Sequence, residues 1–468
     1  MLHEGRNELM RGEPSSAFPA SPHSDYDLFR IEHDSLGEIR VPAKALYGAQ
    51  TQRAIQNFPA VGYRLQPEFI RAIALIKSCA ARINGQLGAI NPELAEAIAR
   101  AADDIASGLY ADQFLAGVFQ TGSGTSTNMN ANEVIAHLSG AHPNDDVNRN
   151  QSSNDVIPSA IHVAAAQRIG RELLPAMACL QQTLASKAAE FRDVSKMGRT
   201  HLQDATPMTL GQEFGGYAHQ VRASAERVTA ALDGLYELPL GGTAIGTGVN
   251  LSPGFAALVI ELISQRTAIP FREARNHFEA QAAKDAVLFM SGALRTYAVA
   301  LTKIANDIRW LASGPRGGLG EIHLPELQPG SSIMPGKANP VIAESLLMIC
   351  AQVIGHDAAI TWCCAAGNFE LNTMMPLIAF DLLDSIELLS AGSGNFAVRC
   401  IAELTANAAR AGALVEQSSA MATLLTPEIG YDKAAAIAKE ALETGRTVRE
   451  VAFEKSGISR DRIEQLLK

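Results

Sequence analysis

The sequence lacks the cysteine spacing that structural zinc sites and iron–sulfur clusters use. Its six cysteines are scattered along 468 residues, and no two of them form a Cys-x-x-Cys pair. Even the adjacent Cys363 and Cys364 are poorly placed to pair with each other. Such sites need closely spaced thiolates. We therefore expect no metal and no cofactor, and reduced thiols inside a cytoplasmic protein.

The sequence also lacks a membrane helix and a secretory signal. No unbroken apolar run reaches the roughly 18 residues that a bilayer-spanning helix needs, so we expect no membrane partner. Residues 1–26 contain Pro, Ser, Gly and charged residues without an apolar stretch. We interpret them as a flexible N-terminal extension.

Positive charge is in the minority. There are 39 Lys and Arg residues against 49 Asp and Glu residues, which gives a net charge of -10. A surface with this balance excludes nucleic acid as an expected partner. An anionic substrate would have to be bound by local groups rather than by the overall field of the protein.

What the sequence contains in abundance is helical periodicity. Asn91-Pro92-Glu93 has the cap and first-turn proline of a helix start, and Gly108 ends that segment. Longer stretches rich in Ala and Leu follow at about 159–191, 208–236, 282–312, 340–366 and 373–398. Helices with so little polar surface must be covered on most sides. The pattern predicts an all-α fold with a helical bundle that several subunits share.

Four segments between these helices are dense in Gly, Ser, Thr, Asn and His, namely 120–130, 141–155, 197–212 and 313–340. The last is a 28-residue segment with six Gly and five Pro. A segment of that length between helices is typical of a mobile active-site loop. A disordered connector is the alternative, but its apolar residues, such as Ile333 and Met334, argue against it.

The segment Gly330–Pro340 carries a cation and two hydroxyls. It is not a phosphate-binding loop, because the glycine spacing is wrong and Ala338 stands where Ser or Thr is required. Lys337 and Asn339 could bind a carboxylate. A neighbouring serine could accept a proton if its alkoxide were stabilised. Taken alone, the segment could equally be an ordinary surface turn.

Two further polar segments are candidates for a binding site. His201 and His142 lie inside polar clusters, and histidine exchanges protons near neutral pH. Segments 121–128 and 151–155 supply hydroxyls and backbone amides that suit small carboxylates. The alternative for both segments is simple helix capping, and the two interpretations are compatible because helix N-termini also bind anions.

Together these motifs resemble the fumarase/aspartase superfamily, whose hallmark SSxMPxKxN is matched by residues 331–339. The resemblance runs from about Phe29 to the C-terminus. Five details resemble the class II fumarases rather than the aspartases: the sequences at 122–125, 151–155, 241–244, 335–336 and 367–372. The alternatives are an aspartate ammonia-lyase on the same scaffold and, more remotely, a non-catalytic crystallin-like protein.

The resemblance implies a reaction and a set of site residues. It implies reversible hydration of fumarate to malate, a tricarboxylic acid cycle step, with Ser331 as the base and His201, charged by Glu344, as the acid or a water-orienting group. It implies that the substrate is bound by Ser123, Gly124, Thr125, Ser152, Ser153, Asn154, Thr200, Ser332, Lys337, Ala338 and Asn339. It also implies a second dicarboxylate site at His142, Pro143, Asn144 and Asp145, although the connection before His142 is shorter than in many fumarases.

The resemblance implies the architecture as well. The family fold has three helical domains, which would here be residues 27–149, 150–406 and 407–468. Four subunits share the central helices as a homotetramer, and each active site takes loops from three of them.

Overall fold

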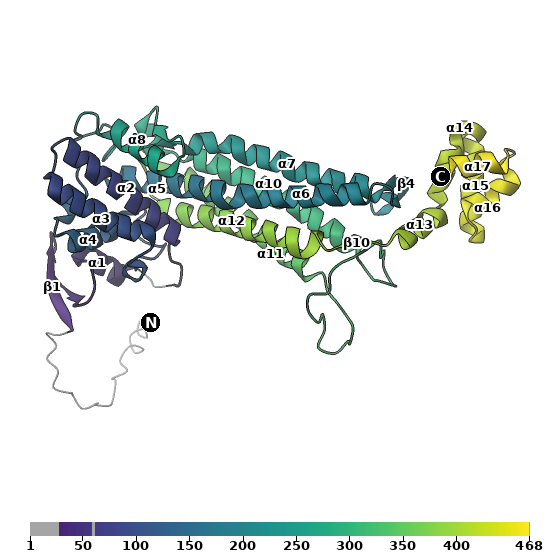
Figure 1. Ribbon diagram of the computed structural model, residues 1–468, viewed down its shortest axis with the longest axis horizontal. Helices are drawn as coiled ribbons and strands as arrows, with labels where there is room; N and C mark the ends of the chain where they lie inside the picture. The colour runs from purple at the N-terminus through teal and green to yellow at the C-terminus, as the bar shows by residue number, and fades with distance from the viewer. Residues whose placement is uncertain (1–27, 59–60, 468) are drawn as a thin grey trace, which may run out of the picture.

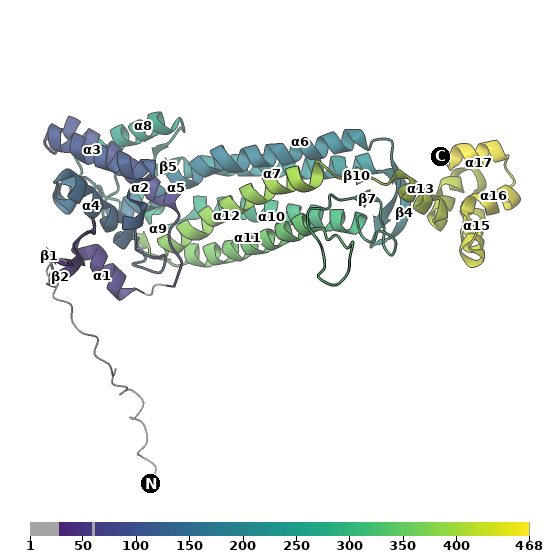
Figure 2. The ribbon, with the colours of Figure 1, turned by 60° about the horizontal axis from the view of Figure 1, so that its bottom comes forward.

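The computed structural model of the protein describes residues 28–58 and 61–467. The expected N-terminal extension, residues 1–26, lies outside the described residues. The described residues form an elongated molecule in which a helical bundle joins two groups of shorter helices, one at each end (Figures 1 and 2).

The N-terminal group packs four helices beside a small antiparallel sheet. Its cap prediction is confirmed, because the Asn91 side chain accepts hydrogen bonds from two first-turn amides and Gly108 adopts a left-handed φ of 106°. The elements are β1 (Phe29–Asp34), β2 (Gly37–Pro42), α1 (Ala49–Asn57), α2 (Pro67–Gln86), α3 (Pro92–Ser107) and α4 (Thr125–Ser139). Helix α2 packs on both α3 and α5, which joins this group to the bundle.

The bundle consists of long helices, so the expected all-α fold is confirmed. We call each long helical segment of the bundle a strut. The first strut is continuous, because α5 (Ser153–Arg168), the π-turn η4 (Ile169–Leu173) and α6 (Leu174–Glu190) follow one another without a break. The other struts are α7 (Leu210–Leu235), α10 (Asp285–Leu311), α11 (Val341–Ala365) and α12 (Met375–Phe396). One hydrophobic core runs through all of them.

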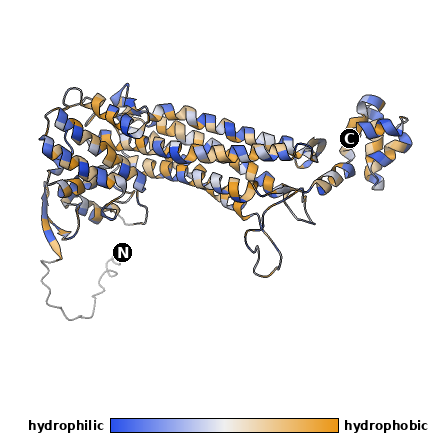
Figure 3. Cartoon of the chain, in the orientation of Figure 1, coloured by the Kyte–Doolittle hydropathy of each residue, from blue (hydrophilic) through white to orange (hydrophobic). Residues whose placement is uncertain are grey.

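Apolar residues occur along the bundle helices (Figure 3), and several of those on α10 and α11 are exposed. Phe289 is 65% exposed, Met348 68% and Trp362 76%. By length and composition alone both helices could cross a membrane. They nevertheless pack against each other and against the bundle, and Arg295 of α10 pairs with Asp357 of α11 at 2.7 Å. A large exposed apolar surface of this kind marks an interaction site.

Short elements connect the struts at the end nearest α2. They are β5 (Glu237–Leu238), α8 (Phe255–Thr267), β6 (Arg272–Glu273), α9 (His277–Ala282), β8 (Gly367–Asn368) and β9 (Leu371–Asn372). At the opposite end lies the C-terminal group: α13 (Ala408–Gln417), α14 (Thr426–Ile429), α15 (Tyr431–Thr444), α16 (Val448–Lys455) and α17 (Arg460–Leu466). The domain boundaries expected at 149/150 and 406/407 stay predictions.

Two of the expected loops are more ordered than the sequence suggests. Segment 197–212 is largely a hairpin of β3 (Ser195–Thr200) and β4 (Gln203–Thr209). Segment 313–340 is anchored near its start, because β7 (Ile322–His323) pairs with β10 (Thr405–Ala406). Next to β7, the fully buried Glu321 accepts two hydrogen bonds from Arg199 at 2.9 and 3.0 Å. The part after β7, residues 324–340, contains no helix or strand.

The ion pair between Arg199 and Glu321 should matter for stability. Arg199→Met leaves the Glu321 carboxylate buried without a cation, which costs about 3–5 kcal/mol. Urea unfolding followed by circular dichroism measures this loss. Arg192→Met is the control, because its ion pair with Asp193 is exposed and contributes at most about 1 kcal/mol. Equal losses in the two variants would contradict the role given to the buried pair.

Candidate active site

The hydroxyl-rich segment before α4 is held close to the start of α12. Gly122 accepts a hydrogen bond from the Met375 amide at 3.0 Å. A Cβ on Gly122 would lie 1.7 Å from the Thr373 carbonyl oxygen, so only glycine allows this approach. The approach places Ser123 and Thr125, whose hydroxyls hydrogen-bond each other at 2.7 Å, at the N-terminus of α4. One of these hydroxyls donates to the other, so one hydroxyl proton remains, and a helix N-terminus of this kind is suited to bind a carboxylate.

Ser152, Ser153 and Asn154 form the start of α5 beside this segment. Ser152 Oγ accepts from the Asn154 amide at 3.2 Å, and Ser153 Oγ accepts from the side chain of Asn128 at 3.0 Å. Since both hydroxyl oxygens already accept a hydrogen bond, both hydroxyl protons are available to an incoming anion. The Ser152 contact confirms the capping interpretation, whereas anion binding by these hydroxyls stays a prediction.

Asp155 fixes this loop against the turn at residues 241–243. Its fully buried carboxylate accepts hydrogen bonds from the amides of Ser152 at 2.9 Å and of Gly241 and Thr243 at 3.0 Å each. Burial raises the pKa of Asp155, although the three amides and the nearby Lys77 act against that rise. The sequence interpretation gave Asp155 no role, although an acid inside a Ser- and Asn-rich helix start is a signal of such a capping contact.

At the other end of the bundle, the loop of residues 324–340 carries Ser331. The Ser331 Oγ accepts hydrogen bonds from the backbone amides of Ile333 at 3.2 Å and Met334 at 3.1 Å. Two amides directed at one hydroxyl oxygen stabilise negative charge on it. This arrangement supplies the support that a serine base requires.

Lys337 and Asn339 belong to the same loop. Lys337 is exposed, and its ammonium makes no hydrogen bond or ion pair with the described residues. Asn339 donates one amide hydrogen to the Gly330 carbonyl at 2.8 Å, which closes the loop and leaves its second hydrogen free. Ser332 and Ala338, in the same loop, are also exposed.

His201 lies at the tip of the hairpin, which the sequence interpretation placed simply between helices. His201 and Leu202 have φ values of 57° and 58° and connect the paired Thr200 and Gln203. Two consecutive left-handed residues characterise a type I′ turn, which normally uses Asn and Gly. Non-glycine residues held in this conformation cluster at functional sites. His201 is exposed, and no hydrogen bond joins it to Glu344 within the single described chain.

One chain does not bring its candidate residues together. The segments before α4 and α5 lie beside the start of α12, whereas the Ser331 loop leads into the opposite end of α11, which packs antiparallel to α12. The 25 residues of α11 span about 37 Å. The His201 hairpin is farther still, because it follows the continuous α5–η4–α6 strut of about 55 Å. Figures 1 and 2 show α5 and β4 at opposite ends.

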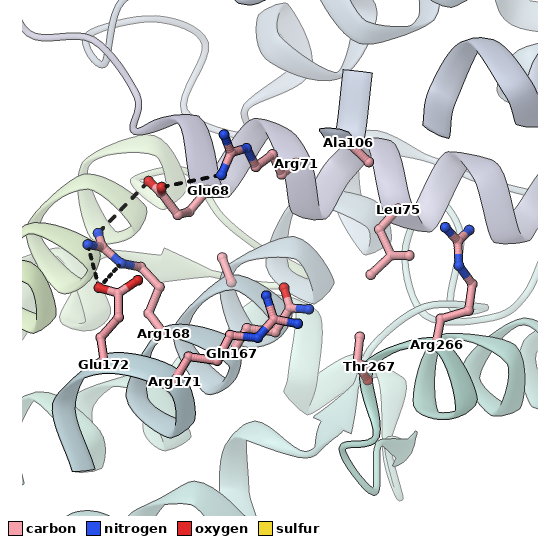
Figure 4. A pocket seen from close by; sticks show the side chains of 11 residues that line it. Glu68, Arg71, Leu75, Ala106, Gln167, Arg168, Arg171, Glu172, Arg266 and Thr267 are labelled. Carbon is pink, nitrogen blue, oxygen red and sulfur yellow. Dashed lines mark hydrogen bonds and ion pairs between the residues drawn. The ribbon is translucent and has the colours of Figure 1, made fainter. Parts of the chain in front are cut away.

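Several cavities lie outside these segments, and two of them bear on the predictions. One of about 450 Å³ is lined by residues 142–144 together with Arg30, Glu32, Asp34 and Glu133. His142 caps the π-turn Pro143–Val147 by accepting from the Asp145 amide at 3.0 Å. A second dicarboxylate site here stays a prediction, with three carboxylates in the same wall. The other cavity, of about 280 Å³, is lined by ion-paired residues such as Arg168 and Glu172 and holds none of the candidates (Figure 4).

Within residues 28–58 and 61–467, no group of three or more His, Cys, Asp or Glu side chains is placed to hold a metal ion. All six cysteines are free, and four of them are buried. Burial raises the pKa of the Cys400 thiol to about 12 and that of Cys79 to about 11. Such thiols are poor nucleophiles at neutral pH.

Comparison with known proteins identifies the family. Residues 37–355 match the lyase family, and residues 421–468 match the fumarase C C-terminus. The chain therefore belongs to the lyase family. Within it, the chain belongs with the class II fumarate hydratases. It is 53% identical over 446 residues to the class II fumarate hydratase of Mycobacterium tuberculosis, with 94% of each chain covered.

Other relatives agree. The class II fumarate hydratase of Corynebacterium glutamicum is 52% identical over 432 residues, with 91% of each chain covered. The crystal structure of class II fumarase from Schistosoma mansoni matches with a TM-score of 0.91 and 38% identity, covering 94% of this chain and 98% of that one. The crystal structure of a fumarate lyase:delta crystallin from Brucella melitensis, bound to cobalt, matches with a TM-score of 0.89 and 45% identity. The match covers 94% of this chain and 98% of that one.

The close approach at Gly122 provides a test of the site. Gly122→Ala must push the Ser123 segment away from Thr373, so we expect at least a tenfold loss of kcat/KM, equivalent to about 1.4 kcal/mol. Gly412→Ala in α13 is the control, because a Cβ there meets nothing within 4 Å. Steady-state kinetics of both variants decide the matter. Unchanged kinetics for Gly122→Ala would show that this segment does not contribute to the site.

Proposed function

We propose that this chain catalyses the reversible hydration of fumarate to malate, with Ser331 as the base. The observation that carries the assignment is the pair of backbone amides directed at Ser331 Oγ, because an alkoxide there is stabilised before substrate arrives. Membership in the class II fumarate hydratases supports the choice of reaction.

In the dehydration direction, the Ser331 alkoxide removes a proton from C3 of malate. The electron pair of the C–H bond moves into the neighbouring carboxylate and forms an aci-carboxylate dianion. When the pair returns to form the C2–C3 double bond, the C2–O bond breaks. The hydroxyl leaves with a proton from His201, or from a water that His201 orients, and forms water. Before the next turnover the proton on Ser331 returns to solvent, and the group that protonated the hydroxyl regains a proton from solvent.

The remaining candidate residues would bind the negative charge of the substrate and of the intermediate. Lys337 and the free amide hydrogen of Asn339 would stabilise the aci-carboxylate, whose charge is greatest in the transition state. The available hydroxyl protons at the starts of α4 and α5 would hold substrate carboxylate oxygens. Ser332, Thr200 and the backbone at Gly124 and Ala338 would complete the enclosure. Glu344 would hold the His201 imidazole in its charged form. No metal or cofactor takes part in these steps.

A complete site requires more than one copy of the chain. The carboxylate-binding hydroxyls and Ser331 lie about one length of α11 apart, so they can meet only if the end of one copy lies against the opposite end of another. The exposed apolar surface of α10 and α11 offers the contact that would hold the copies antiparallel. We propose a cytoplasmic homotetramer whose central helices form one bundle.

The reaction is tested by following fumarate absorbance in the presence of EDTA. Malate should be dehydrated, whereas aspartate should release no appreciable ammonia. Ser331→Ala should lower kcat by at least the ~10²–10⁴-fold typical of acid–base groups, while malate still binds. His201→Asn should lose activity partly through weaker binding, and Glu344→Gln should resemble it more mildly. Aspartate turnover at a rate close to that of malate would overturn the assignment. Serine would not be the base if Ser331→Ala kept most of its kcat.

The shared site is tested by mixing two inactive variants. Asn154→Ala damages the end that binds carboxylate, and Ser331→Ala removes the base at the other end. After dissociation and reassembly together, roughly a quarter of the sites should combine two intact ends and regain activity. Reassembly of each variant alone is the control and should restore nothing. An absence of recovery in mixed assemblies of the correct size would mean that each site lies within one copy.

A further inference from the structure

Helix α2 carries a lysine in its apolar middle. Lys77 is 0% exposed and lies among residues such as Ile73, Ile76 and Ala80, which belong to the hydrophobic core. Burial lowers the pKa of Lys77 to about 7, and the nearby Asp155 acts against that decrease. A buried ammonium is unfavourable unless it is hydrogen-bonded. Its placement therefore calls for a specific partner.

That partner is the side-chain oxygen of Asn148, in the segment just before α5. Lys77 Nζ lies 2.9 Å from Asn148 Oδ1. The same oxygen accepts hydrogen bonds from the amides of Asn132 at 3.1 Å and Asn128 at 3.2 Å, both on α4. Three donors around one oxygen determine how the Asn148 amide is oriented. Its nitrogen then donates to the Gln151 carbonyl at 3.1 Å, next to the loop that binds the substrate.

Asn128 extends the contact to Ser153. The nitrogen that donates to Asn148 also donates to Ser153 Oγ at 3.0 Å, so the Asn128 amide cannot turn to accept from Ser153 instead. With its oxygen accepting from Asn128, Ser153 has its proton left for another acceptor. This hydroxyl lies at the start of α5, which is one of the two helix N-termini proposed above to bind a substrate carboxylate.

We propose that Lys77 is a positioning residue of the active site: acting through Asn148 and Asn128, it commits the Ser153 hydroxyl to donate to a substrate carboxylate. The inference rests on the proposed function, because it requires that Ser153 binds the substrate. Lys77 itself touches no substrate. Its effect should appear in substrate binding rather than in the chemical step.

The test is the KM for malate in the assembled enzyme. Lys77→Met should raise KM about tenfold with little change in kcat, since one oriented hydrogen bond to a charged group contributes about 1.4 kcal/mol or more. Lys187→Met is the matched control. Lys187 is also a buried lysine, and its ammonium lies 2.9 Å from both the Leu404 carbonyl and Glu190. The control should lose stability and keep its KM.

A double-mutant cycle separates positioning from general destabilisation. In the Ser153→Ala background, Lys77→Met should raise KM no further, because the hydroxyl that it orients is absent. Asn128→Leu breaks the same connection while Lys77 is retained. It should reproduce the tenfold rise, which keeps the inference testable if Lys77→Met does not fold.

Each negative result points to one claim. If the wild-type enzyme dehydrates malate, two results would overturn the role of Lys77. One is that Lys77→Met has the same KM as the wild type. If Lys77→Met does not fold, the same KM in Asn128→Leu has the same consequence. The other is an undiminished tenfold effect of Lys77→Met in the Ser153→Ala background. If the wild-type enzyme does not turn over malate at all, the proposed function fails instead.

Discussion

The length of the bundle is the constraint on which the rest of the structure depends. The α5–η4–α6 strut runs without a break, and α7, α10, α11 and α12 lie along it. A helix has a fixed rise per residue, so these struts hold the two ends of the bundle tens of ångströms apart. The chemistry proposed here needs groups from both ends. If the proposed site is right, assembly is a condition of activity rather than an addition to it.

Different physical features prepare the two ends. At the α5 end, buried polar residues fix the predicted binding loop: the carboxylate of Asp155 accepts hydrogen bonds from three backbone amides, and Lys77 donates to Asn148. At the other end, Ser331 lies on an exposed loop whose base is anchored by β7 and Glu321. A rigid half and a more accessible half suit a site that must admit and enclose a small dianion.

Much of this could be predicted from the sequence, because the helices are long and their periodicity is strong. The bundle helices, the cap at Asn91 and the polar segments all have local signals. The turn at His201 and Leu202 has none, since its two left-handed residues are not Asn or Gly and are held by the pairing of β3 with β4. The pairing of β7 with β10 joins residues about 80 positions apart and leaves no local pattern. Lys77 did leave a signal, because it is the one charged residue between Arg71 and Arg82 of α2, but its partners on α4 and before α5 become visible only in the fold.

The central claim is that one bound substrate is held by opposite ends of different copies. A crystal structure of the assembled enzyme with a non-reacting dicarboxylate in the site measures this directly. The account predicts that Ser153 and Asn154 of one copy, and Ser331 and Lys337 of another, lie within hydrogen-bonding distance of the same ligand. A ligand enclosed by both sets of residues from a single copy, or bound without Ser331 nearby, would contradict it.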